Sequence, residues 1–120
     1  MKFYILSMLL LLTGIANATN YYVDASTTAT VQNGGATTPW KTLNQVYSNM
    51  SLFNPGDVIS FKKGLTYTGQ LTVNRSGSAG SPITFNSYGT GAAPVFSGTG
   101  SRINNVIYVF NRNYLVFDGL

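Results

Sequence analysis

The chain has 120 residues, of which 44% are hydrophobic and only 8% are charged, and its formal net charge is +4. Because soluble domains usually carry about 25% charged residues, it lacks the Lys- and Glu-rich surfaces typical of helical bundles. Its apolar content also argues against a disordered chain. With no Cys and no His, disulfides, thiolate nucleophiles, His-containing triads and Cys- or His-ligated metals are excluded here. The length allows at most one domain.

The first 18 residues have the pattern of a secretory signal peptide. Lys2 supplies the positive start, an apolar stretch runs from Phe3 to Leu12, and Ala16 and Ala18 are the small residues of a cleavage site. We therefore expect cleavage before Thr19 and a secreted or cell-surface protein.

A membrane anchor is the alternative for this segment. A spanning helix needs about 20 apolar residues, whereas Ser7, Thr13 and Gly14 interrupt the run. We expect no permanent membrane span after cleavage.

Residues 19–57 are expected to form a strand, a long loop and a capping helix. The run Tyr21 to Val23 favours a strand, and residues 26–38 have no periodicity. Thr38 suits a helix N-cap and Pro39 the first helical position. The apolar side chains of the predicted helix share one face and form its predicted core: Trp40, Leu43, Val46, Tyr47 and Met50.

Residues 58–120 consist of short β-favouring runs separated by turns. The predicted strands are residues 58–61, 70–74, 82–88, 94–97, 105–110 and 114–117. Their apolar and polar residues alternate in the second and third runs, which indicates half-buried strands.

The spacing of these runs indicates a repeat. Ile59, Ile83 and Ile107 are spaced by 24 residues, and a second series follows at Leu71, Val95 and Leu115. A period of about two dozen residues is typical of a solenoid of parallel strands. A β-meander or sandwich is the alternative, but its hairpin dipeptides are missing between the strands. We therefore predict an all-β solenoid, with the helix covering its open apolar end.

Six motifs, in this order, resemble the N-terminal region of secreted bacterial right-handed parallel β-helix proteins of the pectate-lyase-like superfamily. They are YYVDAS (21–26), PWKTL (39–43), PGDVI (55–59), GSPITF (80–85), YGTG (88–91) and FDGL (117–120). The resemblance implies a scaffold shared by polysaccharide lyases, glycoside hydrolases and non-catalytic surface or adhesion proteins. It also implies that more coils follow, so we expect the chain to be truncated at its C-terminus.

The resemblance implies extracellular polysaccharide, including acidic forms, as the partner. Relatives often carry an Asp- and Asn-rich loop after the first strand, but residues 26–38 contain no carboxylate. We therefore expect no cofactor within this chain, and leave calcium as an option for the full-length protein. Nothing in the weak positive charge indicates nucleic-acid binding.

No catalytic set can be assembled from these residues. The acidic residues are Asp24, Asp57 and Asp118, and each lies at a turn, where its side chain can bond its own backbone. The cations Lys62, Lys63, Arg75, Arg102 and Arg112 are spread over different turns. Tyr88, Tyr108, Phe110 and Tyr114 offer flat surfaces for sugars, but core packing or cover by further chain is the favoured interpretation.

Overall fold

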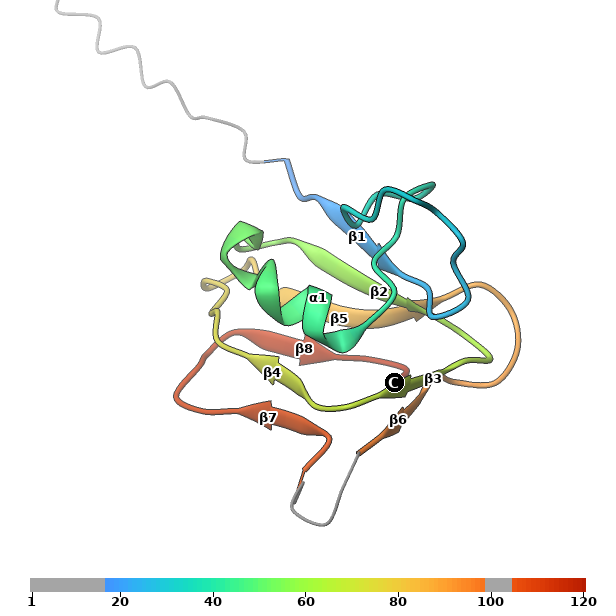
Figure 1. Cartoon of the computed structure of the whole chain (residues 1–120). Coiled ribbons are helices and arrows are strands. Elements are labelled where there is room, and N and C mark those ends of the chain that lie inside the picture. Colours follow the sequence, from blue (N-terminus) through green and yellow to red (C-terminus); the bar gives the residue numbers. More distant parts are fainter. Residues whose placement is uncertain (1–16, 99–104) are drawn as a thin grey trace, which may run out of the picture.

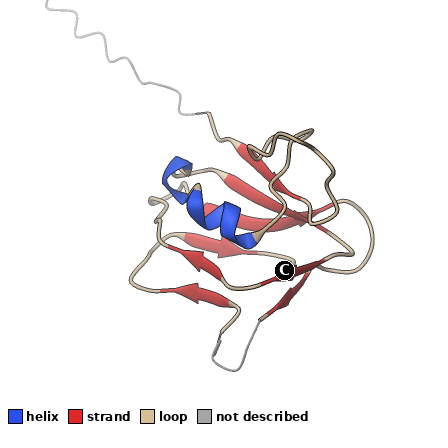
Figure 2. Cartoon of the chain, in the orientation of Figure 1, coloured by secondary structure: helices blue, strands red, loops and turns tan. Residues whose placement is uncertain are grey.

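The computed structural model describes residues 17–98 and 105–120, and strands dominate it (Figure 2). The two short helices are α1 (Leu43–Ser48) and a 3-10 turn (Met50–Leu52). The eight strands are β1 (Asn20–Val23), β2 (Val58–Lys62), β3 (Thr66–Thr68), β4 (Leu71–Val73), β5 (Ile83–Tyr88), β6 (Val95–Ser97), β7 (Ile107–Val109) and β8 (Leu115–Phe117). The predicted all-β class is confirmed.

The strands form three sheets, and every strand pairing is parallel. The first sheet has the order β1-β2-β5-β8, the second pairs β3 with β6, and the third pairs β4 with β7. Along the chain, β2, β3 and β4 lie in the first, second and third sheets, and β5, β6 and β7 repeat this order (Figure 1). Strands β2, β3 and β4 thus pair with β5, β6 and β7, respectively.

The register corrects the predicted spacing of 24 residues. Ile59 pairs with Phe85 rather than Ile83, and Ile107 pairs with Leu71 of the third sheet. The separation between paired residues is 26 from β2 to β5, 29 from β3 to β6, 32 from β5 to β8 and 36 from β4 to β7. The turns between successive strands differ in length, so the separation of paired residues is not constant. The regular 24-residue spacing of the isoleucines does not reflect the strand pairing.

Strand β3 was missed by the sequence analysis. Its sequence, Thr66-Tyr67-Thr68, has only one apolar residue, and that residue is buried while both threonines are exposed. A three-residue strand is too short to show alternation by itself, so only its pairing with β6 reveals it.

Aromatic residues fill much of the core. In the first sheet Tyr21, Ile59 and Phe85 are aligned in register, and Phe117 follows Phe85 with its ring stacked at 5.2 Å and an interplanar angle of 11°. Trp40 stacks on Tyr21 at 5.2 Å with an interplanar angle of 11°. Trp40, which precedes the helix, thus packs on the row of inward-pointing side chains that Tyr21, Ile59 and Phe85 form in the first sheet.

The helix begins later than predicted. Thr42, not Thr38, is the N-cap: its side chain accepts a hydrogen bond from the Gln45 N–H (3.2 Å), and the Gln45 side chain accepts one from the Thr42 N–H (3.1 Å). This capping box satisfies two backbone donors at once. Trp40 instead lies in extended backbone, bridged to Val23 at the edge of β1.

Four of the five predicted helix-core residues, Trp40, Leu43, Val46 and Met50, are at most 2% exposed. The assignment of Tyr47 to this face is wrong, because its side chain is 44% exposed. Helix α1 is only six residues long and packs on β4 (Figure 1). Leu43 and Val46 are the buried residues of this helix.

The predicted signal peptide falls mostly outside the described residues, including Ala16; Ala18 is described and exposed. Where the structure describes the chain, it contains no helix with the length and hydropathy of a membrane span.

Gly34 provides a test of the packing at Trp40. Its φ is +84°, and a Cβ atom there would lie 2.9 Å from the Trp40 ring. Gly64 has a similar φ of +78° but open space around it. We expect Gly64→Ala to lower the free energy of unfolding by about 1 kcal/mol through backbone strain. Gly34→Ala should lower it by about 2–4 kcal/mol, because overpacking adds to that strain.

Urea unfolding followed by Trp40 fluorescence measures both changes. Equal destabilisation by the two substitutions would contradict the close packing of Gly34 against Trp40.

Candidate functional site

A groove runs between helix α1 and the consecutive strands β3 and β4, which belong to different sheets. It comprises three neighbouring cavities of about 220, 330 and 460 Å³, of which the first two share Thr68 and the last two share Tyr47. We call this feature the helix groove. Its strand side is lined by Thr66, Thr68, Gln70, Thr72 and Asn74, and its helix side mainly by Thr42, Asn44, Tyr47, Ser48 and Ser51.

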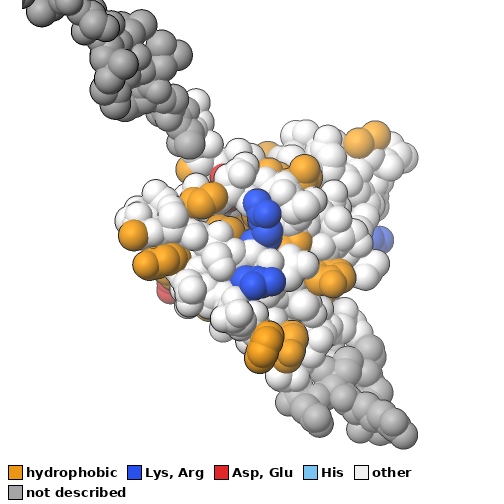
Figure 3. Space-filling model, turned by 90° about the vertical axis from the view of Figure 1, so that its left-hand side faces the viewer, with side chains coloured by type: hydrophobic (Ala, Val, Ile, Leu, Met, Phe, Trp, Pro, Cys, Tyr) orange, Lys and Arg blue, Asp and Glu red, His pale blue; other side chains and the backbone are white. Residues whose placement is uncertain are grey.

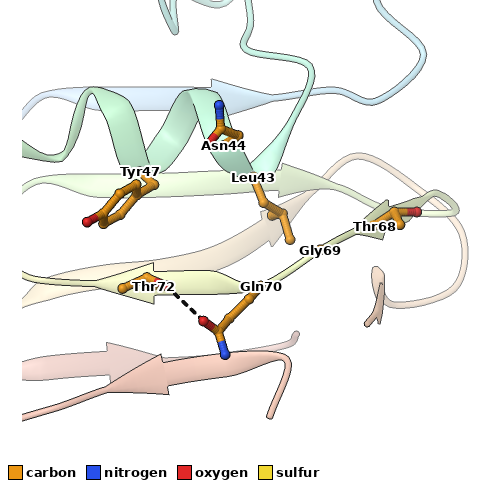
Figure 4. A pocket seen from close by; sticks show the side chains of 7 residues that line it. All are labelled: Leu43, Asn44, Tyr47, Thr68, Gly69, Gln70 and Thr72. Carbon is orange, nitrogen blue, oxygen red and sulfur yellow. Dashed lines mark hydrogen bonds between the residues drawn. The ribbon is translucent and has the colours of Figure 1, made fainter. Parts of the chain in front are cut away.

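The central cavity shows how the two sides meet (Figure 4). Leu43 and Tyr47 lie on α1, opposite the segment that carries Gln70 and, in β4, Thr72. The Thr72 hydroxyl group donates a hydrogen bond to Gln70 Oε1 (3.2 Å), and Gln70 Nε2 donates to the Asn105 carbonyl oxygen (2.8 Å). This network holds the Gln70 amide in place at the groove floor.

The polar lining of the strand side follows from strand geometry. Residues 66, 68, 70, 72 and 74 are Thr, Thr, Gln, Thr and Asn, and the alternate residues Tyr67, Leu71 and Val73 are buried. Because successive side chains of a strand point to opposite faces, one face supplies the core and the other supplies hydroxyl and amide groups. This polar alternation is visible in the sequence, but only part of it was recognised there.

Two tyrosines neighbour Thr72. Tyr47 lines the same cavity as Thr72, and Tyr108 of β7 pairs with Thr72 in register and is 39% exposed. Such rings offer flat apolar surfaces with a polar edge. Hydroxyl, amide and aromatic groups together can hydrogen-bond and stack on an uncharged polar molecule.

The ends of the helix groove carry cations. Lys41 lines the smallest cavity and Arg75 the largest. The Arg75 guanidinium group donates two hydrogen bonds to the Phe53 carbonyl oxygen, at 2.9 and 3.1 Å. Charged groups are sparse on the side of the molecule shown in Figure 3, where basic side chains lie among separate hydrophobic patches.

A second polar cluster lies at the ends of strands β1, β2 and β5. Lys62 Nζ forms an ion pair with Asp24 Oδ2 at 2.8 Å, and Ser26 donates its backbone N–H to Asp24 Oδ1 (2.8 Å). Lys62 pairs in register with Tyr88, whose ring meets Tyr22 edge to face at 5.3 Å. The cluster therefore ties three neighbouring strands together on the outer face of the first sheet.

These contacts change the proton affinities of the cluster. Burial raises the pKa of Asp24, but hydrogen bonds from Lys62 and Ser26 and the charge of Lys62 outweigh it, so that the pKa lies below its ordinary value. The hydrogen bond to Asp24, followed by its charge, raises the pKa of Lys62. Burial and then the Asp24 charge raise the pKa of Tyr88.

Tyr67, which lies behind the cluster, is a structural group. Its hydroxyl lies 2.9 Å from the Val23 carbonyl oxygen and 3.1 Å from that of Lys62. Burial raises its pKa to about 12, so the phenol stays protonated at neutral pH.

The described carboxylates do not converge. Asp57 is buried in the turn before β2, where it accepts hydrogen bonds from the backbone N–H groups of Asn54 and Thr19, whereas Asp118 is exposed after β8. In residues 17–98 and 105–120, no group of three acidic side chains lies close enough to hold a metal ion.

The remaining sequence candidates are dispersed. Lys62 and Arg75 have the partners given above, and Arg112 donates to the Asn111 carbonyl oxygen. Arg102 lies outside the described residues. Among the aromatic candidates, Phe110 and Tyr114 are 70% and 56% exposed. Only Tyr108 lies beside the helix groove.

Comparison with known proteins identifies solved structures with a similar fold. No protein-family model and no curated protein matches the chain. Two crystal structures of the GH136 lacto-N-biosidase from Eubacterium ramulus, the native protein and its selenomethionine derivative, match it with TM-scores of 0.65 and 0.68 at 22% identity. The matches cover 84% and 85% of this chain but only 19% and 20% of those chains. The chain thus spans about a fifth of their length and shares their fold over that region.

The Asp24–Lys62 ion pair predicts an acid-dependent loss of stability. Because the pKa of Asp24 is lowered on folding, its contribution is present above the unfolded value of about 3.9 and is lost as pH falls through the folded value. We expect Lys62→Met to lower the thermal unfolding midpoint at pH 7. The gap between the wild-type and variant midpoints should be smaller at a strongly acidic pH, at which Asp24 becomes protonated and the ion pair is lost, than at pH 7.

Lys63→Met is the matched control, because the described ion pair involves Lys62 and not its neighbour. A gap of the same size at both pH values would contradict a charge-based contribution from Lys62.

Proposed function

We propose that this chain is the N-terminal part of an exported right-handed parallel β-helix protein of the pectate-lyase-like superfamily. Two observations support the proposal. All strand pairings are parallel, and the chain passes through the three sheets in a repeating order. The six motifs quoted above resemble this superfamily independently of the structure.

The proposed role of the full-length protein is to act on extracellular polysaccharide, as a lyase or a hydrolase. The likeness of the fold to crystal structures of a lacto-N-biosidase supports a carbohydrate ligand. Retaining and inverting glycosidases both need two facing carboxyl groups, about 5–10 Å apart. Asp24 and Asp57 are instead engaged in local hydrogen bonds. We therefore place catalysis outside the described residues and assign this region to scaffold and binding.

The helix groove is the observation that carries the binding assignment. Its hydroxyl and amide groups match the hydrogen-bonding groups of sugars, and Tyr47 supplies an exposed ring for the apolar face of a sugar. Lys41 and Arg75 at the ends can attract acidic sugars. Extracellular glycans, both neutral and acidic, are therefore the proposed ligands.

A non-catalytic surface or adhesion protein is the second candidate. Such a protein needs only the helix groove and no pair of facing carboxyl groups. Both candidates share the helix groove, and they differ in whether polysaccharide is cleaved.

Tyr47→Ala tests the groove. Loss of a stacked ring costs about 0.5–1.5 kcal/mol, so we expect affinity for a bound oligosaccharide to fall about 2- to 13-fold. Isothermal titration with oligogalacturonate, alginate oligosaccharides and neutral oligosaccharides measures this change. Phe110→Ala, which removes an exposed ring outside the groove, should leave the affinity unchanged. Equal losses in both variants would refute the site.

Cleavage assays distinguish the two candidates. We expect the full-length protein to release fragments from at least one of pectin, alginate and glycosaminoglycans. A lyase generates the ultraviolet absorbance of an unsaturated sugar end, whereas a hydrolase generates new reducing ends without that absorbance. A folded, complete protein that binds oligosaccharides but yields neither product would favour the non-catalytic candidate.

A further inference from the structure

Asp57 is a buried carboxylate without a cationic partner among the described residues. It is 2% exposed, and the ion pair found in residues 17–98 and 105–120 joins Lys62 to Asp24 instead. A buried charge is costly unless an opposite charge and hydrogen bonds compensate it. Asp57 has the hydrogen bonds but lacks the opposite charge.

The hydrogen bonds of Asp57 come from backbone groups on two segments. Asn54 donates its N–H to Oδ2 (2.8 Å), and Thr19 donates its N–H to Oδ1 (2.9 Å). The Arg75 guanidinium group donates to the carbonyl oxygen of Phe53, the residue before Asn54, and forms no ion pair with Asp57. The atom placed to supply positive charge to Asp57 is therefore the nitrogen of Thr19.

Thr19 is also the residue at which the mature chain is predicted to begin. We propose that cleavage between Ala18 and Thr19 converts the Thr19 nitrogen into an α-ammonium group that forms an ion pair with Asp57 and stabilises the mature fold. The cleavage is a hydrolysis by a peptidase of the signal-peptidase class. Water adds its oxygen to the Ala18 carbonyl carbon, the C–N bond breaks, and the Thr19 nitrogen takes up protons to become an ammonium group at neutral pH.

The surroundings keep this nitrogen close to Asp57. The Thr19 carbonyl oxygen accepts a hydrogen bond from the Val58 N–H (3.0 Å), which aligns residue 19 beside the start of β2. The next residue, Asn20, pairs with Val58 in register. The position of the nitrogen is thus set by backbone contacts on its C-terminal side, which remain after cleavage. In the precursor the same nitrogen is a neutral amide.

Mass spectrometry of the exported protein and thermal unfolding test this proposal. The exported chain should begin at Thr19. Three forms of the protein are then compared at pH 7: one beginning at Thr19, the same form with an acetylated N-terminus, and one beginning at Ala18. We expect the free Thr19 form to unfold about 4 °C or more above the other two, because only it places an ammonium group beside Asp57.

Asp57→Asn removes the carboxylate while keeping an acceptor oxygen, so the advantage of the free Thr19 form should disappear in this variant. If Asp57→Asn does not fold, the acetylated form still decides the outcome in the wild-type sequence. An exported chain that begins at another residue, or equal midpoints for the free and acetylated Thr19 forms, would overturn the proposal.

Discussion

The parallel register of the first sheet is the constraint on which the rest of the structure depends. It aligns Tyr21, Ile59 and Phe85 on the inner face, with Phe117 stacked on Phe85. A shift of one strand by a single residue would turn polar neighbours such as Ser60 inward and apolar side chains outward. Burial therefore specifies the register strongly. Trp40 and the helix region pack on this row, so their positions depend on it too.

The same alternation determines where chemistry can occur. Inner faces are filled by aromatic and aliphatic side chains, whereas outer faces carry the Asp24–Lys62 cluster and the hydroxyl and amide groups of the helix groove. The Asp24–Lys62 ion pair links the ends of β1 and β2, so we assign it a structural role. The groove combines hydroxyl and amide groups with an exposed tyrosine, which makes it the better candidate for binding.

The sequence was sufficient to predict the all-β class, most of the strands and four buried residues of the helix region. It failed where tertiary contacts decide between local alternatives. The capping box of Thr42 and Gln45 prevails over the Thr38–Pro39 signal because Trp40 is held in extended backbone beside β1. Tyr47 satisfies the helical period, but a six-residue helix covers too little area to bury it. The groove depends on β3, whose three residues are too few to show an alternation by themselves.

The pairing of distant segments also has a kinetic consequence. Every strand pairing among β1 to β8 joins residues at least 26 positions apart, and β1 pairs with β2 across 38 positions. Closing such loops costs entropy before any contact compensates for it, so high contact order slows folding. The first strand has no pairing partner until residue 58 has been synthesised. We expect a chain of this topology to fold more slowly than a helical chain of equal length. Slow folding would suit the export proposed above, because a chain that is still extended can be translocated.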